Sequence, residues 1–233
     1  MKVCIITARG GSKRIPKKNI KDFLGKPIIA YSIEAAINSG AFDEVMVSTD
    51  SEEIAKIAME YGAKVPFFRS NENANDFAVT RDVCKEVIES YRKEGKDFDI
   101  FACVYPTAPF LTADKLKAAV ETLEKSDAYS LVPVVQFSFP PQRGVVIRDG
   151  LMEFINPEFA QTRSQDLESV YHDCGQFYIE RTDKFLEEFT LVTSKTVPFV
   201  MPEEEVQDID NYSDWAIAEM KYKLLRDKNE QTV

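Results

Sequence analysis

Short apolar runs alternate along the chain with longer segments in which apolar residues recur every three or four positions. A short apolar run predicts a buried strand, and the longer period predicts an amphipathic helix with one face turned to a core. The predicted strands cover residues 2–7, 44–48, 64–68, 100–105, 129–135, 175–180 and 196–200. The predicted helices cover residues 27–40, 50–62, 80–95, 112–126, 183–189 and 211–228.

This alternation predicts an α/β fold with three layers, in which helices cover both faces of a mainly parallel, Rossmann-like sheet. Parallel neighbours joined through a helix are connected by right-handed crossovers. Ligands of such sheets bind beyond the carboxyl ends of the strands. The loop that follows the strand at residues 2–7 therefore lies at the binding edge.

Two helix starts carry recognisable signals. Asp50 and Glu53 have the spacing of a capping box at the start of the helix over residues 50–62. Thr80 opens the helix over residues 80–95 and has the side chain of an N-cap residue.

The alternation stops between residues 136 and 171, where prolines and aromatic residues accumulate. Asp149-Gly150, between two apolar runs, is a strong signal for a two-residue hairpin turn. An isolated hairpin is marginal in water, so this arm needs cover from its own domain or from a second copy of the chain. We predict one sheet domain of residues 1–135 and 172–233 with an inserted dimerisation arm at 136–171. A homodimer would bury the apolar side chains of Phe137, Phe139, Val145, Ile147, Leu151 and Phe154.

Charge and composition narrow the class of protein. The 233 residues carry a formal net charge of -10, whereas a nucleic-acid footprint is normally basic, so nucleic acid is not an expected partner. No apolar run approaches the ~20 residues that cross a bilayer, so no membrane is expected either. We expect Cys4, Cys84, Cys103 and Cys174, which show no CxxC pair, to be reduced in a cytoplasmic protein.

One short loop runs against the overall acidity: residues 9–21 hold six Lys or Arg and no acidic residue. Gly10 and Gly11 allow close backbone approach and positive φ, and successive amides in such a turn form an anion-binding nest. Ser12 adds a hydroxyl, and Arg9 and Lys13 add positive charge suited to phosphate. The spacing is neither that of a P-loop nor GxGxxG. These residues alone are consistent with two interpretations: a binding site for a triphosphate, or a solvated basic turn.

Asp208 and Asp210 stand two residues apart in an extended segment, so their side chains point to the same side of the chain. Converging hard oxygen donors suit Mg²⁺, which also takes phosphate oxygens and water as ligands. The alternative role is helix capping, because Asp210 directly precedes the helix over residues 211–228.

Five segments in order resemble the sialic acid (acylneuraminate) cytidylyltransferase family. They are ARGGSKRIPKKNIKDFLGKPIIAYSI, DEVMVSTDSEEIAKIAMEYGAKVPFFRS, YPTAPFL, RSQDLESVYHDCGQFYI and QDIDNYSDW. Within the family, YPTAPF and HDCGQFY are most similar to the bacterial pseudaminic acid enzymes. The resemblance implies transfer of CMP from CTP to a nine-carbon sugar acid, release of pyrophosphate, use of Mg²⁺, and a role in CMP-sugar biosynthesis for flagellin glycosylation. The alternatives are N-acetylneuraminate or a legionaminate-type sugar as substrate, or a catalytically silent nucleotide-binding protein.

The resemblance also implies that the sheet domain is a nucleotidyltransferase domain, and it implies roles for individual residues. Arg9, Lys13, Lys18, Asp208 and Asp210 would form the catalytic set, with both carboxylates on the metal. The nucleotide would lie against Arg9, Gly10, Gly11, Ser12, Lys13, Lys18, Asn19, Arg69 and Thr80. The alternative for Arg69 is a surface ion pair with Glu72 or Asp76. The sugar acid would lie against Arg163, Gln165, His172, Asp173 and Gln176, with Arg163 on the substrate carboxylate. The alternative for His172 and Asp173 is a structural hydrogen-bonded pair, and no general base is evident.

Overall fold

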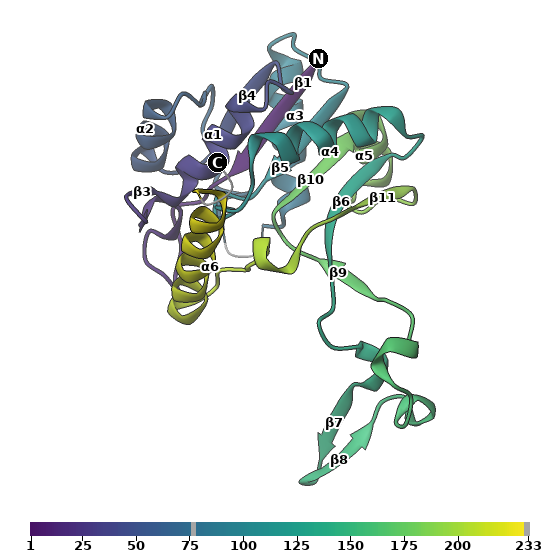
Figure 1. The fold of residues 1–233 in the computed structure, drawn as a ribbon. Helices are drawn as coiled ribbons and strands as arrows, with labels where there is room; N and C mark the ends of the chain where they lie inside the picture. The colour runs from purple at the N-terminus through teal and green to yellow at the C-terminus, as the bar shows by residue number, and fades with distance from the viewer. Residues whose placement is uncertain (76–77, 231–233) are drawn as a thin grey trace.

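A seven-stranded sheet forms the centre of the protein in the computed structural model, which describes residues 1–75 and 78–230. Its hydrogen-bonded strand order is β11-β6-β10-β5-β1-β4, and β9 pairs with β6 beyond this path (Figure 1). The strands are β1 (Lys2–Thr7), β4 (Glu44–Ser48), β5 (Ile100–Val104), β6 (Ser130–Gln136), β9 (Tyr171–Asp173), β10 (Phe177–Arg181) and β11 (Thr196–Val200).

The sheet is mainly parallel, as the sequence predicts, but β9 and β10 are reversed. β1 pairs in parallel with β4 and β5, and β11 pairs in parallel with β6. β10 runs antiparallel to both β5 and β6, and β9 runs antiparallel to β6. No crossover helix separates β6 from β9 and β10, so the chain returns in the opposite direction after the arm.

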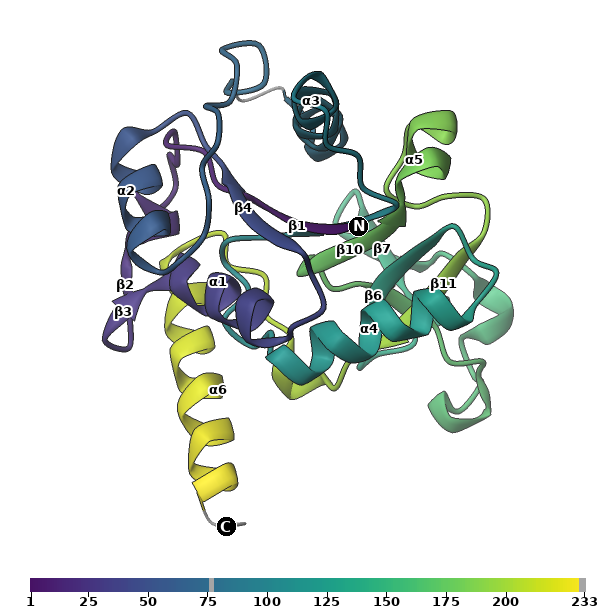
Figure 2. The ribbon, with the colours of Figure 1, turned by 90° about the horizontal axis from the view of Figure 1, so that it is seen from above.

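Helices cover both faces of the sheet, which confirms the three-layer prediction (Figure 2). One face carries α1 (Ile28–Asn38), α2 (Glu52–Glu60) and α4 (Ala113–Lys125), and their apolar side chains share a core cluster with Cys4 and Ile6 of β1. The other face carries α3 (Thr80–Lys93) and α5 (Thr182–Glu188), which pack with Val3 and Ile5. Alternate residues of β1 thus serve two cores, which is why this strand is apolar throughout.

The terminal helix α6 (Tyr212–Glu230) packs against the start of α1 rather than on the sheet. Trp215 and Ala218 of α6 join Phe23 and Ile28 in a separate core cluster. The same cluster contains Ile15 of the basic loop and Ile209, which lies between the two predicted metal-binding aspartates. The first and last parts of the chain therefore meet through buried apolar contacts, and these contacts bring two distant polar segments together.

The remaining elements are short. The two-residue strands β2 (Asp22–Phe23) and β3 (Lys26–Pro27) pair with each other before α1. Single turns of 3-10 helix are η1 (Lys18–Ile20), η2 (Pro141–Arg143), η3 (Pro157–Phe159), η4 (Ser164–Asp166) and η5 (Glu203–Glu205). No helix among residues 1–75 and 78–230 is long and apolar enough to cross a membrane.

Three local predictions differ from the structure. The N-cap of α2 is Ser51, whose side chain accepts a hydrogen bond from the Ile54 amide, so the expected capping box of Asp50 and Glu53 is wrong by one residue. The N-cap of α3 is Val79, and Thr80 is already helical. Residues 64–68 form one isolated bridge between Lys64 and Met46 rather than a strand, and Pro66 explains this because it has no amide hydrogen to donate.

The predicted hairpin is present. β7 (Val145–Arg148) and β8 (Leu151–Phe154) pair antiparallel across Asp149 and Gly150, whose φ values are 52° and 80°. Two positive φ values in a two-residue turn are the geometry that matches the twist of paired strands. The hairpin is a sheet of its own and extends away from the main sheet beyond β9 (Figure 1).

Candidate active site

A cavity of about 490 Å³ opens at the carboxyl end of β1 and β5. Side chains from the basic loop form one wall, and the segment before α6 contributes two carboxylates. The lining residues are Thr7, Arg9, Ser12, Lys13, Arg14, Lys18, Asn19, Arg69, Ala78, Thr80, Val83, Tyr105, Pro106, Thr107, Asp208 and Asp210. The predicted cationic loop and the predicted aspartate pair therefore converge on one space, although 190 residues separate Lys18 from Asp208.

The backbone of the basic loop differs from the predicted nest in two respects. Neither Gly10 nor Gly11 is among the residues with positive φ. The amide of Gly10 donates to Asp50 Oδ1 at 2.8 Å, so a carboxylate of this chain already binds the group that was expected to bind phosphate. Gly10 is nevertheless confined, because a Cβ there would lie 3.2 Å from the Cβ of Ser51.

Lys18 and Asn19 are held by hydrogen bonds to main-chain carbonyls. Lys18 Nζ donates to the carbonyl of Ile209 at 2.6 Å and lies 3.9 Å from Asp210 Oδ1. Burial lowers the pKa of Lys18, although the charges of Asp210 and Asp208 oppose this shift. Asn19 is buried and donates to the carbonyl of Arg9 at 2.9 Å. Lys18 thus ties the basic loop to the aspartate segment, Asn19 ties one end of the loop to the other, and both line the cavity.

Arg69 is buried, so the alternative of a surface ion pair with Glu72 is wrong. The other partner in that alternative, Asp76, lies outside the described residues. Its guanidinium donates to Ser48 Oγ at 3.1 Å and to the Ser48 carbonyl at 2.7 Å, at the end of β4. Burial lowers the pKa of Arg69 while the charges of Asp50 and Glu86 raise it. Arg69 thus presents a fixed cation at the cavity wall.

The two aspartates have the setting of a cation site. Burial and then the charge of Asp210 raise the pKa of Asp208, so a cation between the two would relieve both an unfavourable burial and a repulsion. Asp210 does not cap α6, because Asn211 Oδ1 accepts from the amides of Ser213 and Asp214. Two carboxylates are the donors that Mg²⁺ prefers. Among the described residues, no group of three or more His, Cys, Asp or Glu gathers as a metal cluster.

A second cavity, of about 520 Å³, adjoins the first, and Asp208 lines both. His172, Asp173 and Phe137 line it from β9 and from the chain after β6, and Lys221 lines it from α6. The ring of Phe137 lies 4.6 Å from that of His172, and His172 Nδ1 contacts the carbonyl of Asp173 at 2.8 Å. Of the five residues predicted to bind sugar, His172 and Asp173 are therefore beside the first cavity.

The other three predicted sugar residues lie elsewhere. Gln176 is buried, lines neither of these cavities, and donates from Nε2 to the carbonyl of Glu205 at 2.7 Å. It acts as a support for the segment before Asp208, because that carbonyl belongs to η5. Arg163 and Gln165 lie in the arm, and the Arg163 guanidinium pairs with Asp166 at 2.8 Å. The chain's own fold does not bring Arg163 or Gln165 to the walls of the two joined cavities.

Sequence reasoning gave no site role to Arg14, Tyr105, Thr107 or Tyr178, although Tyr105 and Thr107 lie in the YPTAPF segment that carries part of the family resemblance. Arg14 lies in the basic loop, and its Nη2 is 2.7 Å from Asp210 Oδ1. Tyr105 lines the first cavity and its hydroxyl is 3.4 Å from Thr80 Oγ1, while the Tyr178 hydroxyl donates to the carboxylate of Asp173, a residue that lines the second cavity. The signal available for Arg14 was its place in a cationic run; Tyr178 lies in an apolar strand and offered none.

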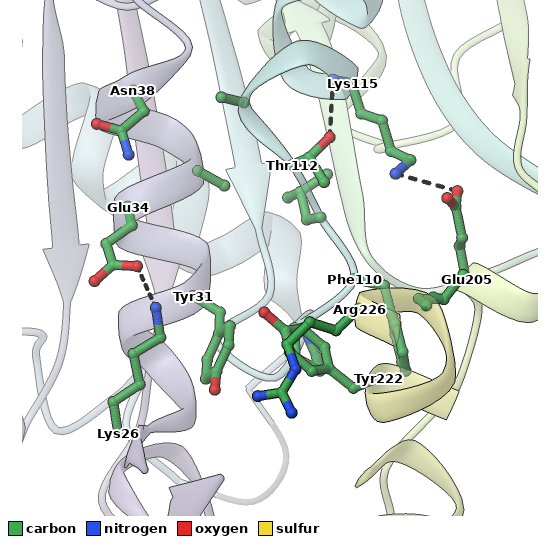
Figure 3. A pocket seen from close by; sticks show the side chains of 15 residues that line it. Lys26, Tyr31, Glu34, Asn38, Phe110, Thr112, Lys115, Glu205, Tyr222 and Arg226 are labelled. Carbon is green, nitrogen blue, oxygen red and sulfur yellow. Dashed lines mark hydrogen bonds and ion pairs between the residues drawn. The ribbon is translucent and has the colours of Figure 1, made fainter. Parts of the chain in front are cut away.

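A third cavity, of about 350 Å³, lies between α1, the start of α4 and α6 (Figure 3). It contains none of the predicted site residues. Its charged side chains include two internal ion pairs, Lys26 with Glu34 and Lys115 with Glu205, and aromatic rings form much of its remaining wall. With these charges already paired and no carboxylate couple, this cavity is a poor seat for a polyphosphate.

Known proteins are similar to this chain in sequence and in fold. A family model described as cytidylyltransferase matches residues 3–207. Pseudaminic acid cytidylyltransferase of Campylobacter jejuni is 43% identical over 95% of this chain and 96% of its own length. CMP-N,N'-diacetyllegionaminic acid synthase of Legionella pneumophila is 35% identical over 95% of this chain and 96% of its own length. A solved CMP:2-keto-3-deoxy-manno-octonic acid synthetase in complex with CTP shares the fold, with a TM-score of 0.68, 17% identity and coverage of 97% and 99%.

Proposed function

Because this chain belongs to the cytidylyltransferase family, we propose that it transfers CMP from CTP to the anomeric hydroxyl of pseudaminic acid, a nine-carbon sugar acid, and releases pyrophosphate. The chain is a nucleotidyltransferase by family. The choice of pseudaminic acid is supported by the relatives at 42% and 43% identity, which carry this activity in their names.

One observation carries the mechanism: five cationic side chains and two carboxylates line a single cavity. Arg9, Lys13, Arg14, Lys18 and Arg69 supply positive charge for the triphosphate. Such fixed charges stabilise the negative charge that builds on the phosphoryl oxygens and on leaving pyrophosphate. The rest of the chain's contribution is positioning, since phosphoryl and nucleotidyl transfer need little covalent chemistry from the protein.

The joined cavities suggest how the two substrates meet. The nucleotide would occupy the cavity of the basic loop, and the sugar acid the cavity of His172 and Asp173. Asp208 lies in the wall of both, so the sugar hydroxyl and the α-phosphorus would approach each other at this residue. Asp208 and Asp210 are the residues that would hold Mg²⁺, which when bound neutralises charge on the phosphate oxygens.

The substrate assignment predicts the outcome of a pyrophosphate-release assay with CTP, Mg²⁺ and a panel of sugar acids. Release should be fastest with pseudaminic acid, slower with legionaminate-type acids and N-acetylneuraminate, and absent when CTP or the sugar is omitted. Faster release with another sugar would overturn the substrate and leave the reaction class standing. No release with any member of the panel would favour a nucleotide-binding protein without catalysis.

The metal assignment predicts that changing both Asp208 and Asp210 to Asn abolishes turnover and leaves the protein folded. Loss of both charges removes the cation site, but it also removes the burial of charge and the repulsion by Asp210 that together raise the pKa of Asp208. Circular dichroism and pyrophosphate release measure the two properties. Asp227→Asn, on the exposed side of α6, is the matched control and should change neither. An unfolded double variant would assign the pair a structural role instead.

We also propose that the enzyme is a cytoplasmic homodimer. Its four cysteines are free and buried, which suits a reducing compartment. The hairpin of the arm leaves an apolar face uncovered within one chain, and a second copy would cover it. A dimer would also give Arg163 and Gln165 a route to a sugar acid, through the site of the other copy. CTP and the sugar acid are the proposed small-molecule partners.

A further inference from the structure

We propose that Arg14 is an exchangeable counter-ion, which neutralises Asp210 while the site is empty and moves to the triphosphate when metal and CTP bind. This rests on the proposed function, because it takes the triphosphate as the ligand of the first cavity. Arg14 forms an ion pair with Asp210, and both residues line the first cavity.

The ion pair joins the two halves of the site. Arg14 belongs to the loop after β1, Asp210 to the segment before α6, and their side-chain atoms Nη2 and Oδ1 are 2.7 Å apart. The guanidinium at this distance uses a lone pair of Oδ1, an oxygen that a metal ion would also use. Arg14 and a cation therefore compete for the same carboxylate oxygen.

The ion pair of Arg14 with Asp210 is more exposed to water than the neighbouring contact of Lys18 with Asp210, so it can break more easily. The Arg14 side chain is 68% exposed and that of Asp210 is 38% exposed, so water screens their attraction and the pair contributes little stability. Lys18 is only 21% exposed and its Nζ is tied to the carbonyl of Ile209 at 2.6 Å. Lys18 therefore stays in place while Arg14 can swing.

The triphosphate gives Arg14 a second partner of the same kind. Arg14 lines the cavity beside Arg9, Lys13 and Ser12, where the phosphates are proposed to lie. A guanidinium binds two phosphate oxygens at once, as it binds a carboxylate. On binding of the metal complex of CTP, Asp210 exchanges Arg14 for the metal and Arg14 exchanges Asp210 for phosphate. Each charge keeps an opposite partner before and after, so the exchange avoids leaving either one uncompensated.

The exchange predicts that one substitution at Arg14 raises the affinity for metal and lowers the affinity for CTP. Arg14→Gln should tighten Mn²⁺ binding to the nucleotide-free protein about two- to fivefold, the range expected for loss of a competing exposed ion pair. The same substitution should weaken CTP binding, because a phosphate contact is lost. Arg14→Lys, which keeps the charge and loses the planar fork, should give intermediate values for both.

Mn²⁺ binding can be followed by the paramagnetic resonance signal of the free ion, and CTP binding by equilibrium dialysis with Mg²⁺. Lys17→Gln is the control, since Lys17 carries the same charge in the same loop but pairs with Glu53 at 2.7 Å and does not line the cavity. It should change neither affinity by more than a small factor. Unchanged or weaker Mn²⁺ binding in Arg14→Gln, or unchanged CTP binding, would refute the exchange.

The same binding measurements distinguish failure of the proposed function from failure of the Arg14 exchange. If the wild-type protein binds no CTP, or if Asp208→Asn with Asp210→Asn leaves Mn²⁺ binding unaltered, the site itself has been misassigned. If the wild type binds both ligands and the double variant loses the metal, the site stands and only the behaviour of Arg14 decides the proposal.

Discussion

At the residue scale, Glu180 is the side chain most at odds with its surroundings. It lies in β10, is fully buried, and neither of its carboxyl oxygens has a hydrogen-bond partner in the structure. Burial, with smaller contributions from Cys103 and Glu188, raises its pKa to about 10. The folded protein therefore holds Glu180 protonated at neutral pH, whereas the unfolded chain ionises it.

Because of this difference, we predict that Glu180 lowers the free energy of unfolding increasingly as pH rises, and that Glu180→Gln removes this effect. Above a pH of about 4.5 the unfolded chain binds fewer protons than the folded one, so stability falls as pH rises, by about 1.4 kcal/mol per unit at most, until the folded pKa is reached. The stability of Glu180→Gln relative to wild type should rise steadily from pH 5 to pH 9 in urea unfolding. The exposed Glu187→Gln is the control, and parallel pH profiles for Glu180→Gln and wild type would show that Glu180 is not neutral in the fold.

At the element scale, the single turn η5 determines the position of the segment that contains Asp208 and Asp210. Side chains from three other parts of the fold hold this turn and its next residue. Gln176 donates to the Glu205 carbonyl at 2.7 Å, Lys221 Nζ donates to the Val206 carbonyl at 2.8 Å, and Lys115 pairs with Glu205 at 3.1 Å. Asp208 follows two residues later, so a shift of the turn would move one wall of both joined cavities.

We predict that Lys221→Met raises the Mg²⁺ concentration needed for half-maximal activity and lowers kcat about tenfold, since small displacements at a reacting centre are costly. Loss of two main-chain contacts should lower stability by only about 1–2 kcal/mol. Lys223→Met removes the same charge from an exposed position of α6 and should behave as wild type. Lys221→Arg should recover part of the loss. An unaltered Mg²⁺ dependence in Lys221→Met would mean that η5 does not position the aspartates.

At the scale of the whole molecule, the arm is the part that one chain leaves incomplete. In the β7–β8 hairpin, cross-strand pairing puts Val145, Ile147, Met152 and Phe154 on one face. Ile147 is 78% exposed and Met152 62% exposed. The other face carries Val146, Arg148, Leu151 and Glu153, with an ion pair between Arg148 and Glu153 at 3.0 Å. Leu151, which the sequence grouped with Val145, Ile147 and Phe154, therefore lies on the opposite face, because its cross-strand partner is Arg148. The arm is thus amphipathic, and Ile147 and Met152 leave most of its apolar side exposed within the described chain.

If the apolar face is the contact between two copies, Ile147→Glu should convert a dimer to monomers, because a carboxylate would be buried without a partner. Leu151→Glu places the same charge at a similarly exposed position on the opposite face and should leave the dimer intact. Sedimentation velocity at several protein concentrations separates the two states. A wild-type protein that is monomeric at every concentration, or an Ile147→Glu protein that stays dimeric, would exclude this contact.

Local patterns predicted most of the elements, and the exceptions have local causes. The hairpin turn follows from Asp149-Gly150 because two adjacent residues tolerate positive φ. The strand expected at residues 64–68 fails at Pro66, and the cap of α2 moves from Asp50 to Ser51, since two adjacent residues both have capping side chains. Asp50 instead binds the Gly10 amide, a partner 40 residues away that the sequence does not reveal.

The sequence by itself determined the order of strands and helices, the site of the hairpin and the cationic loop, because each depends on neighbouring residues and their periodicity. The spacing of the two aspartates indicated a cation site, the family resemblance favoured that role over helix capping, and the fold placed them with that loop. Only the tertiary structure decided that Arg14 pairs with Asp210, that Gln176 supports η5 instead of facing a sugar, and that Asp208 lies between two cavities. These facts depend on the packing of α6 and the basic loop around Ile15, Phe23 and Ile209, and contacts between such distant segments leave no trace in local sequence.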